Sequence, residues 1–119
     1  IKVHTIGEVV INGQGIGKQS VIGLVKKGNT EEELINKFKD GDILVTSSVD
    51  KELVPFFERA GAVVIEEGGL TSHGAILALH FKKPTVIGAK DAMSILNDEM
   101  IITVDSSSGA VYKGSARVL

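Results

Sequence analysis

The chain contains 119 residues, of which 43% are hydrophobic and 4% aromatic, and its formal net charge at pH 7 is -2. This length suits one domain with a mainly aliphatic core, and the slightly acidic balance without a basic patch excludes nucleic acid and anionic membrane surfaces as ligands. Zero cysteines exclude disulfides, thiolate metal sites and a cysteine nucleophile, and they fit a reducing, cytoplasmic compartment.

The first part of the chain alternates short β-branched stretches with glycines, which predicts strands and tight turns. The strands expected here span 3–6, 9–11 and 21–25. Between them, Gly13, Gly15 and Gly17 favour a tight hairpin over a phosphate-binding loop, because their spacing fits neither the dinucleotide nor the P-loop fingerprint. A chain that opens directly in a strand is expected to be a domain excised from a longer protein. No apolar run approaches the length of a membrane span.

Helices are expected to alternate with buried strands in the middle of the chain. Thr30 and Glu33 form a capping box at the start of the first helix. Leu34, Ile35 and Phe38 would form the apolar face of this helix, which a glycine would end. The predicted helices span 30–41, 50–60, 72–81 and 92–96. The predicted strands span 42–46, 62–65, 85–87, 100–104 and 110–112.

The order of these elements predicts the fold class. Pro55 lies inside the second helix, so a loose first turn should precede it and a regular helix should follow it. The Val/Ile-rich strands need burial on both faces, which implies a parallel sheet covered on both sides. Strands near the two ends would add antiparallel pairs. We therefore expect an α/β fold, a β/β/α sandwich with a mixed sheet and about three to four helices, in one domain spanning 1–119.

The stretch 68–76, Gly-Gly-Leu-Thr-Ser-His-Gly-Ala-Ile, joins a predicted strand to the start of a helix. The first amides of a helix have no intrahelical partner and carry partial positive charge, so this junction predicts an anion-binding site. Gly68 and Gly69 would let the backbone adopt positive φ and approach a ligand closely. Thr71 is the expected N-cap, and Ser72 adds a hydroxyl donor.

His73 is the candidate for chemistry in this stretch. The positive helix end disfavours the imidazolium form, so a neutral ring with a nucleophilic nitrogen is expected near pH 7. Beside free amides such a ring could accept a phosphoryl group, or it could merely cap the helix or bond a nearby carbonyl. Glu66 and Glu67 could orient the ring, although solvated positions are favoured. His80 lies two turns further along, too far to share a metal ion, and no metal site is predicted.

Seven residues of this stretch match the phosphohistidine motif of phosphoenolpyruvate-utilising enzymes: Gly68, Gly69, Thr71, Ser72, His73, Ala75 and Ile76. Further matches extend over most of the chain, at Pro84, Gly88, 102–105 and 109–112. The sequence therefore resembles the mobile domain of this family, which includes pyruvate phosphate dikinase, phosphoenolpyruvate synthase and enzyme I of the sugar phosphotransferase system. The resemblance implies a swivelling β/β/α phosphohistidine domain, whose histidine carries phosphate between distant active sites.

Within the family, the sequence looks most like the related domain at the C-terminus of pyruvate kinases from bacilli and staphylococci. The similar features are the loop 13–17, the helix 50–60 with Pro55 and Glu58, and the closing stretch 114–119. The resemblance implies that 1–119 is a single phosphohistidine-like domain excised from the C-terminus of a cytoplasmic enzyme, with the remaining domains of that parent as its partners. The parent would transfer phosphate between phosphoenolpyruvate and ADP in glycolysis, using Mg²⁺ and K⁺ bound outside this domain.

Leu79 separates two hypotheses about His73. Phosphotransferring members carry an arginine six residues after the histidine, and its replacement by Leu79 removes a charge-assisted contact of about 1.5–3 kcal/mol. We therefore expect a structural or regulatory accessory domain that could bind a phosphate-bearing ligand, without a cofactor of its own. The residues expected to contact that ligand are Gly68, Gly69, Thr71, Ser72, His73 and Gly74. The alternative is a catalytic phosphocarrier of the dikinase or synthase type, in which His73 is transiently phosphorylated.

Gly74 departs mildly from the family pattern, because alanine or another small residue is usual at this position. Glycine is a poor helix former, since it loses more conformational freedom on folding than alanine does. We therefore expect Gly74 to weaken the helix start by up to about 1 kcal/mol.

Overall fold

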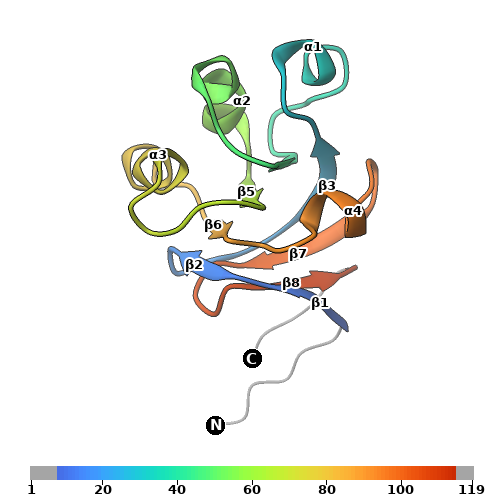
Figure 1. Cartoon of the computed structure of the whole chain (residues 1–119). Coiled ribbons are helices and arrows are strands. Elements are labelled where there is room, and N and C mark those ends of the chain that lie inside the picture. The colour runs from blue at the N-terminus through green and yellow to red at the C-terminus, as the bar shows by residue number, and fades with distance from the viewer. Residues whose placement is uncertain (1–7, 115–119) are drawn as a thin grey trace, which may run out of the picture.

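The structure, a computed structural model, describes residues 8–114 and shows two layers of strands and one of helices (Figure 1). The predicted strand at 3–6 and the closing residues 115–119 lie outside the described residues. The strands are β1 (Glu8–Asn12), β2 (Gln14–Ile16), β3 (Ser20–Lys27), β4 (Ile43–Thr46), β5 (Ala62–Ile65), β6 (Thr85–Ile87), β7 (Ile101–Asp105) and β8 (Ala110–Lys113). The helices are α1 (Glu31–Leu34), the 3-10 helix η1 (Lys51–Leu53), α2 (Val54–Arg59), α3 (His73–Phe81) and α4 (Ala92–Ile95). Within 8–114, no helix has the length and apolar character needed to cross a membrane.

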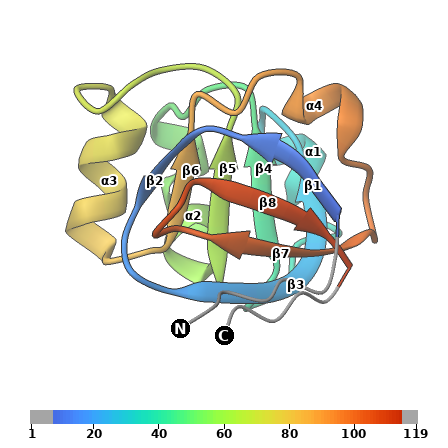
Figure 2. The same cartoon turned by 90° about the horizontal axis from the view of Figure 1, so that it is seen from below.

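The strands form one mixed sheet of order β1-β8-β7-β3-β4-β5-β6-β2. Its middle strands, β3 to β6, run parallel to one another, and the other neighbours pair antiparallel. The two edge strands, β1 and β2, are separated in the chain by Gly13 alone, so the sheet must fold back on itself. Figure 2 shows the result, with β7 and β8 crossing over β4 and β5. The predicted mixed sheet is therefore confirmed.

Alternate side chains of the parallel strands enter two different cores. On β4, Ile43 and Val45 pack between the two strand layers, whereas Leu44 packs between the sheet and the helices. On β5, Val64 and Val63 repeat this alternation. Burial on both faces explains why these strands are aliphatic without interruption. The predicted β/β/α sandwich is confirmed.

The glycine-rich segment at 13–17 is not a hairpin, contrary to the prediction. Its strand β2 pairs with β6, and neither β1 nor β3 pairs with it. The segment instead packs its backbone directly on the turn 106–109: the Gly13 amide donates to the Gly109 carbonyl at 2.8 Å. A Cβ atom on Gly15 would collide with the carbonyl of Ser106. These glycines allow two backbones to touch, a requirement that local spacing does not distinguish from a turn.

The first predicted helix, at 30–41, is much shorter than expected. Its capping box forms, because Thr30 Oγ1 accepts from the Glu33 amide at 3.2 Å, but α1 ends at Leu34. Beyond it the Lys39 amide donates to the Asp42 carboxylate at 2.9 Å, so a side chain replaces a helical acceptor. Ile35 is 56% exposed and does not belong to the apolar face, which was predicted wrongly.

The break predicted at Pro55 is confirmed. Asp50 accepts from the Glu52 amide at 3.1 Å and caps η1, and α2 begins at Val54 with Pro55 in its first turn. Proline lacks an amide hydrogen, and the first turn of a helix is where that hydrogen has no acceptor. The following Phe57 is fully buried against the helix face of the sheet.

Asp98 ties the segment after α4 to the end of β3. It accepts from the Lys27 amide at 2.8 Å and from Lys37 Nζ at 2.7 Å, and Lys37 Nζ also donates to the Lys27 carbonyl. Burial by itself would raise the pKa of Asp98, but the hydrogen bond from the Lys27 amide and the ammonium of Lys37 outweigh it and hold that pKa below its ordinary value.

Asp98→Asn is expected to lower the thermal midpoint at pH 7, and the difference from the wild type should shrink in acid. A carboxyl whose folded pKa is lowered stabilises the fold above its unfolded pKa and loses that contribution as the pH falls through the folded value. Thermal unfolding of both proteins from pH 7 to about pH 3 measures this difference. A difference that stayed constant over this range would contradict the assignment.

Candidate functional site

The candidate site lies where β5 hands over to α3, at the carboxyl edge of the parallel strands. Backbone pairing continues past the strand ends: the Glu66 amide donates to the Thr46 carbonyl and the Glu67 amide to the Ser47 carbonyl, each at 2.9 Å. The loop 68–72 therefore leaves a fixed base. Ligands of open α/β sheets bind at this edge, because the connecting loops there are free of the sheet.

The two glycines of the motif play different roles. Gly68 has φ +103°, a region that glycine alone adopts easily, and a Cβ atom there would lie 3.0 Å from Ser72 Oγ. Gly69 does not have positive φ, so that part of the prediction was wrong. A Cβ atom on Gly69 would meet only Gln14 Oε1, at 3.9 Å. Gly68 shapes the loop, and Gly69 leaves its outer surface open.

Ser72, rather than the predicted Thr71, is the N-cap of α3. Its Oγ accepts from the Ala75 amide at 3.4 Å and donates to the Gly69 carbonyl at 2.7 Å. Its hydroxyl hydrogen is therefore engaged within the loop and is not a free donor to a ligand. Thr71 is exposed. Thr and Ser are both good N-caps, and the hydrogen bonds of the preceding turn decided which of the two takes the position.

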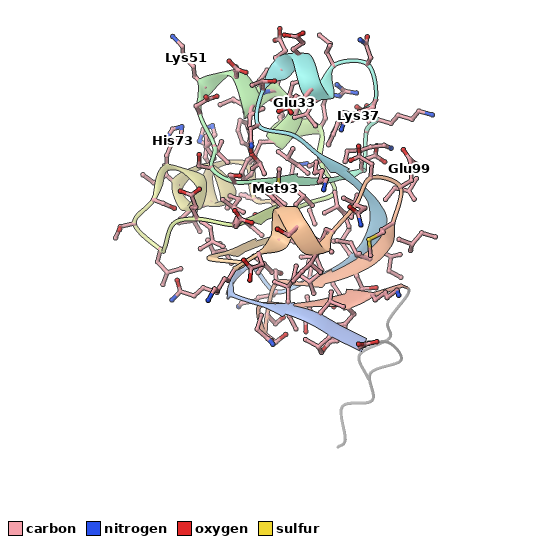
Figure 3. The ribbon with its side chains drawn as sticks, turned by 45° about the vertical axis from the view of Figure 1, so that its right-hand side comes forward. Glu33, Lys37, Lys51, His73, Met93 and Glu99 are labelled. Carbon is pink, nitrogen blue, oxygen red and sulfur yellow. The ribbon has the colours of Figure 1, made fainter. Side chains whose placement is uncertain are left out.

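His73 is the first residue of α3 and its side chain is exposed, projecting from the ribbon (Figure 3). A cavity of about 260 Å³ lies beside it, between α3 and the segment that follows β4. The residues that line it are Ser48, Val49, Ile65, Glu67, Gly68, Ser72, His73 and Gly74. Within residues 8–114, the His73 and Gly74 amides have no hydrogen-bond acceptor. An imidazole and two free amides thus share one small opening.

The charge of this cavity does not favour a phosphate. Its lining contains the carboxylate of Glu67 and neither lysine nor arginine. Leu79, at the position of the family arginine, is 68% exposed and does not line the cavity. An anion bound here would rely on backbone amides and the helix dipole, which are weaker than a bidentate cation.

Glu66 has a role that the sequence analysis missed. Its Oε2 accepts from the amide of Met93 at 3.0 Å, so it caps α4, whose own N-cap Asp91 makes no side-chain hydrogen bond (Figure 3 labels Met93). The two residues are 27 apart in the chain, and no local pattern signals such a pair. Glu66 therefore serves the fold, whereas Glu67 faces the cavity.

Gly74 is required by packing. It is buried, and a Cβ atom on it would lie 2.6 Å from Ile65 Cδ1 and 3.5 Å from Ile87 Cδ1. Glycine lets α3 approach the sheet closely just after His73. The expected weakening of the helix start is thus accompanied by a closer helix–sheet contact.

His80 is exposed near the end of α3, with its ring edge against Phe81 at 4.8 Å between centroids. In the part of the chain that the structure describes, no three His, Cys, Asp or Glu side chains gather as metal ligands would.

Comparison with known proteins identifies relatives along the whole sequence. The family described as "PEP-utilising enzyme, mobile domain" matches residues 38–109. All 119 residues align with pyruvate kinases, with 47% identity to that of Bacillus licheniformis, 44% to that of Geobacillus stearothermophilus and 37% to that of Staphylococcus aureus. The chain covers 20% of each of these proteins, so it spans about a fifth of the length of the curated relatives it matches.

Solved structures support the fold. Aconitase X of Thermococcus kodakaraensis superposes with a TM-score of 0.63 at 18% identity, over 92% of this chain and 97% of that one. A solution structure of Enzyme I superposes with a TM-score of 0.55 at 22% identity, over 65% of this chain and 32% of that one. At such low identity these similarities concern the architecture alone.

Proposed function

The chain belongs to the mobile-domain family of phosphoenolpyruvate-utilising enzymes, and from this membership we propose that it is the C-terminal accessory domain of a bacterial pyruvate kinase. The parent would transfer a phosphoryl group between phosphoenolpyruvate and ADP in other domains, in the cytoplasm, with Mg²⁺ and K⁺ bound there. This domain would stabilise those domains or couple them to an effector. The alignment of all 119 residues with pyruvate kinases is the observation that carries the proposal.

The surroundings of His73 support an accessory role over phosphate turnover. A phosphocarrier histidine attacks phosphorus with a ring nitrogen while pyruvate leaves, and the charge that develops on the phosphoryl oxygens needs cationic donors. The cavity beside His73 offers two amides and opposes them with Glu67. The residue at the family arginine position, Leu79, is not a donor and lies outside that cavity.

As part of this proposal, the loop 68–74 contacts a phosphate-bearing group without reacting with it. The donors are the amides of His73 and Gly74, with the ring of His73 at the rim. Gly68 and Gly69 hold the loop open, Ser72 fixes the helix start, and the exposed Thr71 borders the contact. Binding through amides alone is expected to be weak and to depend on salt.

The parent enzyme incubated with phosphoenolpyruvate carrying a labelled phosphoryl group is expected to show no acid-labile label on His73. Phosphohistidine is lost in acid and retained in base, so mass analysis of peptides prepared under basic conditions detects it. His80→Ala is the matched control, because His80 is an exposed histidine on the same helix. Label that persists in His80→Ala and disappears in His73→Ala would establish the phosphocarrier instead.

A further inference from the structure

A second opening lies at the other end of α3 from His73. It has a volume of about 270 Å³ and lies between the end of that helix and the connection from β2 to β3. Its walls combine three lysines with aliphatic side chains: Lys18, Lys82, Lys83, Ile16, Leu79 and Pro84. We call this opening the lysine groove. No acidic side chain lines it.

The three lysines of the groove are free of the ion pairs that occupy other cations in the molecule. Elsewhere, Lys26, Lys37 and Arg59 each bind a carboxylate within 3.1 Å. Among residues 8–114, no carboxylate pairs with Lys18, Lys82 or Lys83. Three unneutralised ammonium groups around one concave opening create a local positive field in a chain that is acidic overall.

Lys82 occupies a backbone position that glycine would fill with less strain. It is the C-cap of α3, with φ 56° and ψ 42°, in the left-handed region that helices commonly reserve for glycine. Lysines near a helix C-terminus complement the helix dipole, which accounts for Lys82 and Lys83. The dipole does not account for Lys18, which comes from another segment, or for the aliphatic floor beside it.

We propose that the lysine groove binds a small phosphate monoester. The phosphate would lie among the ammonium groups of Lys18, Lys82 and Lys83, and the organic part would cover Ile16, Leu79 and Pro84. The groove is at the lower end of the size range of small-molecule sites, which restricts the organic part to a compact group. This site is separate from the loop 68–74, so it does not depend on the function proposed for His73.

The test is a titration of the chain with phenyl phosphate, inorganic phosphate and phenol, followed by amide shifts in NMR spectra. Phenyl phosphate is expected to bind more tightly than inorganic phosphate, phenol is expected not to bind, and the shifts should concentrate at Gly17, Lys18, Lys82 and Lys83. Shifts concentrated at His73 and Gly74 would place the anion at the other end of α3 and overturn the proposal.

Two variants with the same change in net charge separate the groove from general electrostatics. Lys18→Gln with Lys82→Gly is expected to weaken phenyl phosphate binding on the order of tenfold, the loss of one charge-assisted contact. Lys90→Gln with Lys113→Gln removes two exposed lysines outside the groove and is expected to change binding less than twofold. Equal weakening in both variants would overturn the proposal.

The fold of the groove variant is checked by its own backbone. Glycine at 82 relieves the positive φ, so Lys82→Gly alone should have a thermal midpoint equal to or above that of the wild type while binding less phenyl phosphate. Unchanged binding in this stable variant would exclude Lys82 from the site and contradict the proposal.

Discussion

Gly15→Ala is expected to destabilise the domain by about 3 kcal/mol or more, at or above the top of the usual overpacking range. The added Cβ would collide with the Ser106 carbonyl and lie 2.9 Å from the Gly109 amide nitrogen. Both are backbone atoms, so no side chain can rotate away to make room. The layers joined by the segment 13–17 would have to separate. Urea unfolding followed by circular dichroism measures the change.

Gly69→Ala is the matched control for Gly15→Ala. A Cβ at position 69 has no neighbour closer than Gln14 Oε1 at 3.9 Å, and the backbone there does not need positive φ. We expect this substitution to change the free energy of unfolding by less than about 0.5 kcal/mol, as exposed substitutions generally do. Equal losses in both variants would mean that the contact of the segment 13–17 with the turn 106–109 does not hold the layers together.

Lys26→Met is expected to cost about 3–5 kcal/mol of stability, because it leaves a buried carboxylate without its counter-ion. Lys26 is only 3% exposed, and its ammonium lies 2.9 Å from Asp42 Oδ2 and 3.1 Å from Glu99 Oε1. Asp42 is also buried and keeps only the hydrogen bond from the Lys39 amide in this variant. Methionine matches the length of the lysine stem, so the loss reports the charge more than the packing.

A double-mutant cycle isolates this pair. Asp42→Asn can still accept from the Lys39 amide, so Lys26→Met with Asp42→Asn should recover more than half of the stability that Lys26→Met loses. Burial by itself would lower the pKa of Lys26, but Asp42 and Glu99 outweigh it and raise that pKa above 10.5. The contribution is therefore complete below about pH 10.5 and declines as the pH rises through the folded value. A loss under 1 kcal/mol in Lys26→Met at neutral pH would refute the role of the pair.

Local patterns were sufficient wherever the deciding interactions are close in sequence. The aliphatic runs of β4 and β5 predicted strands buried on both faces, and Pro55 predicted the break before α2. The motif around His73 predicted a helix start beside a small opening, and the structure places His73 there. Each of these features follows from the periodicity or backbone chemistry of neighbouring residues.

Site details that depend on distant partners could not be predicted in this way. The choice of Ser72 over Thr71 as N-cap follows from hydrogen bonds with Gly69 in the folded loop. The role of Glu66 depends on Met93, which another helix brings to it. The lysine groove joins Lys18 to the end of α3 across more than half of the chain, and nothing in either segment by itself suggests a site.

The sequence by itself determined the order of the central strands and helices, the two buried faces of the sheet and the position of His73 at a helix start, because hydrophobic period and helix capping act over a few residues. Only the tertiary structure decided how the segment 13–17 joins the two strand layers and which charges surround each end of α3. Those features depend on contacts between segments far apart in the chain, and such contacts exist only after the sheet has folded back on itself.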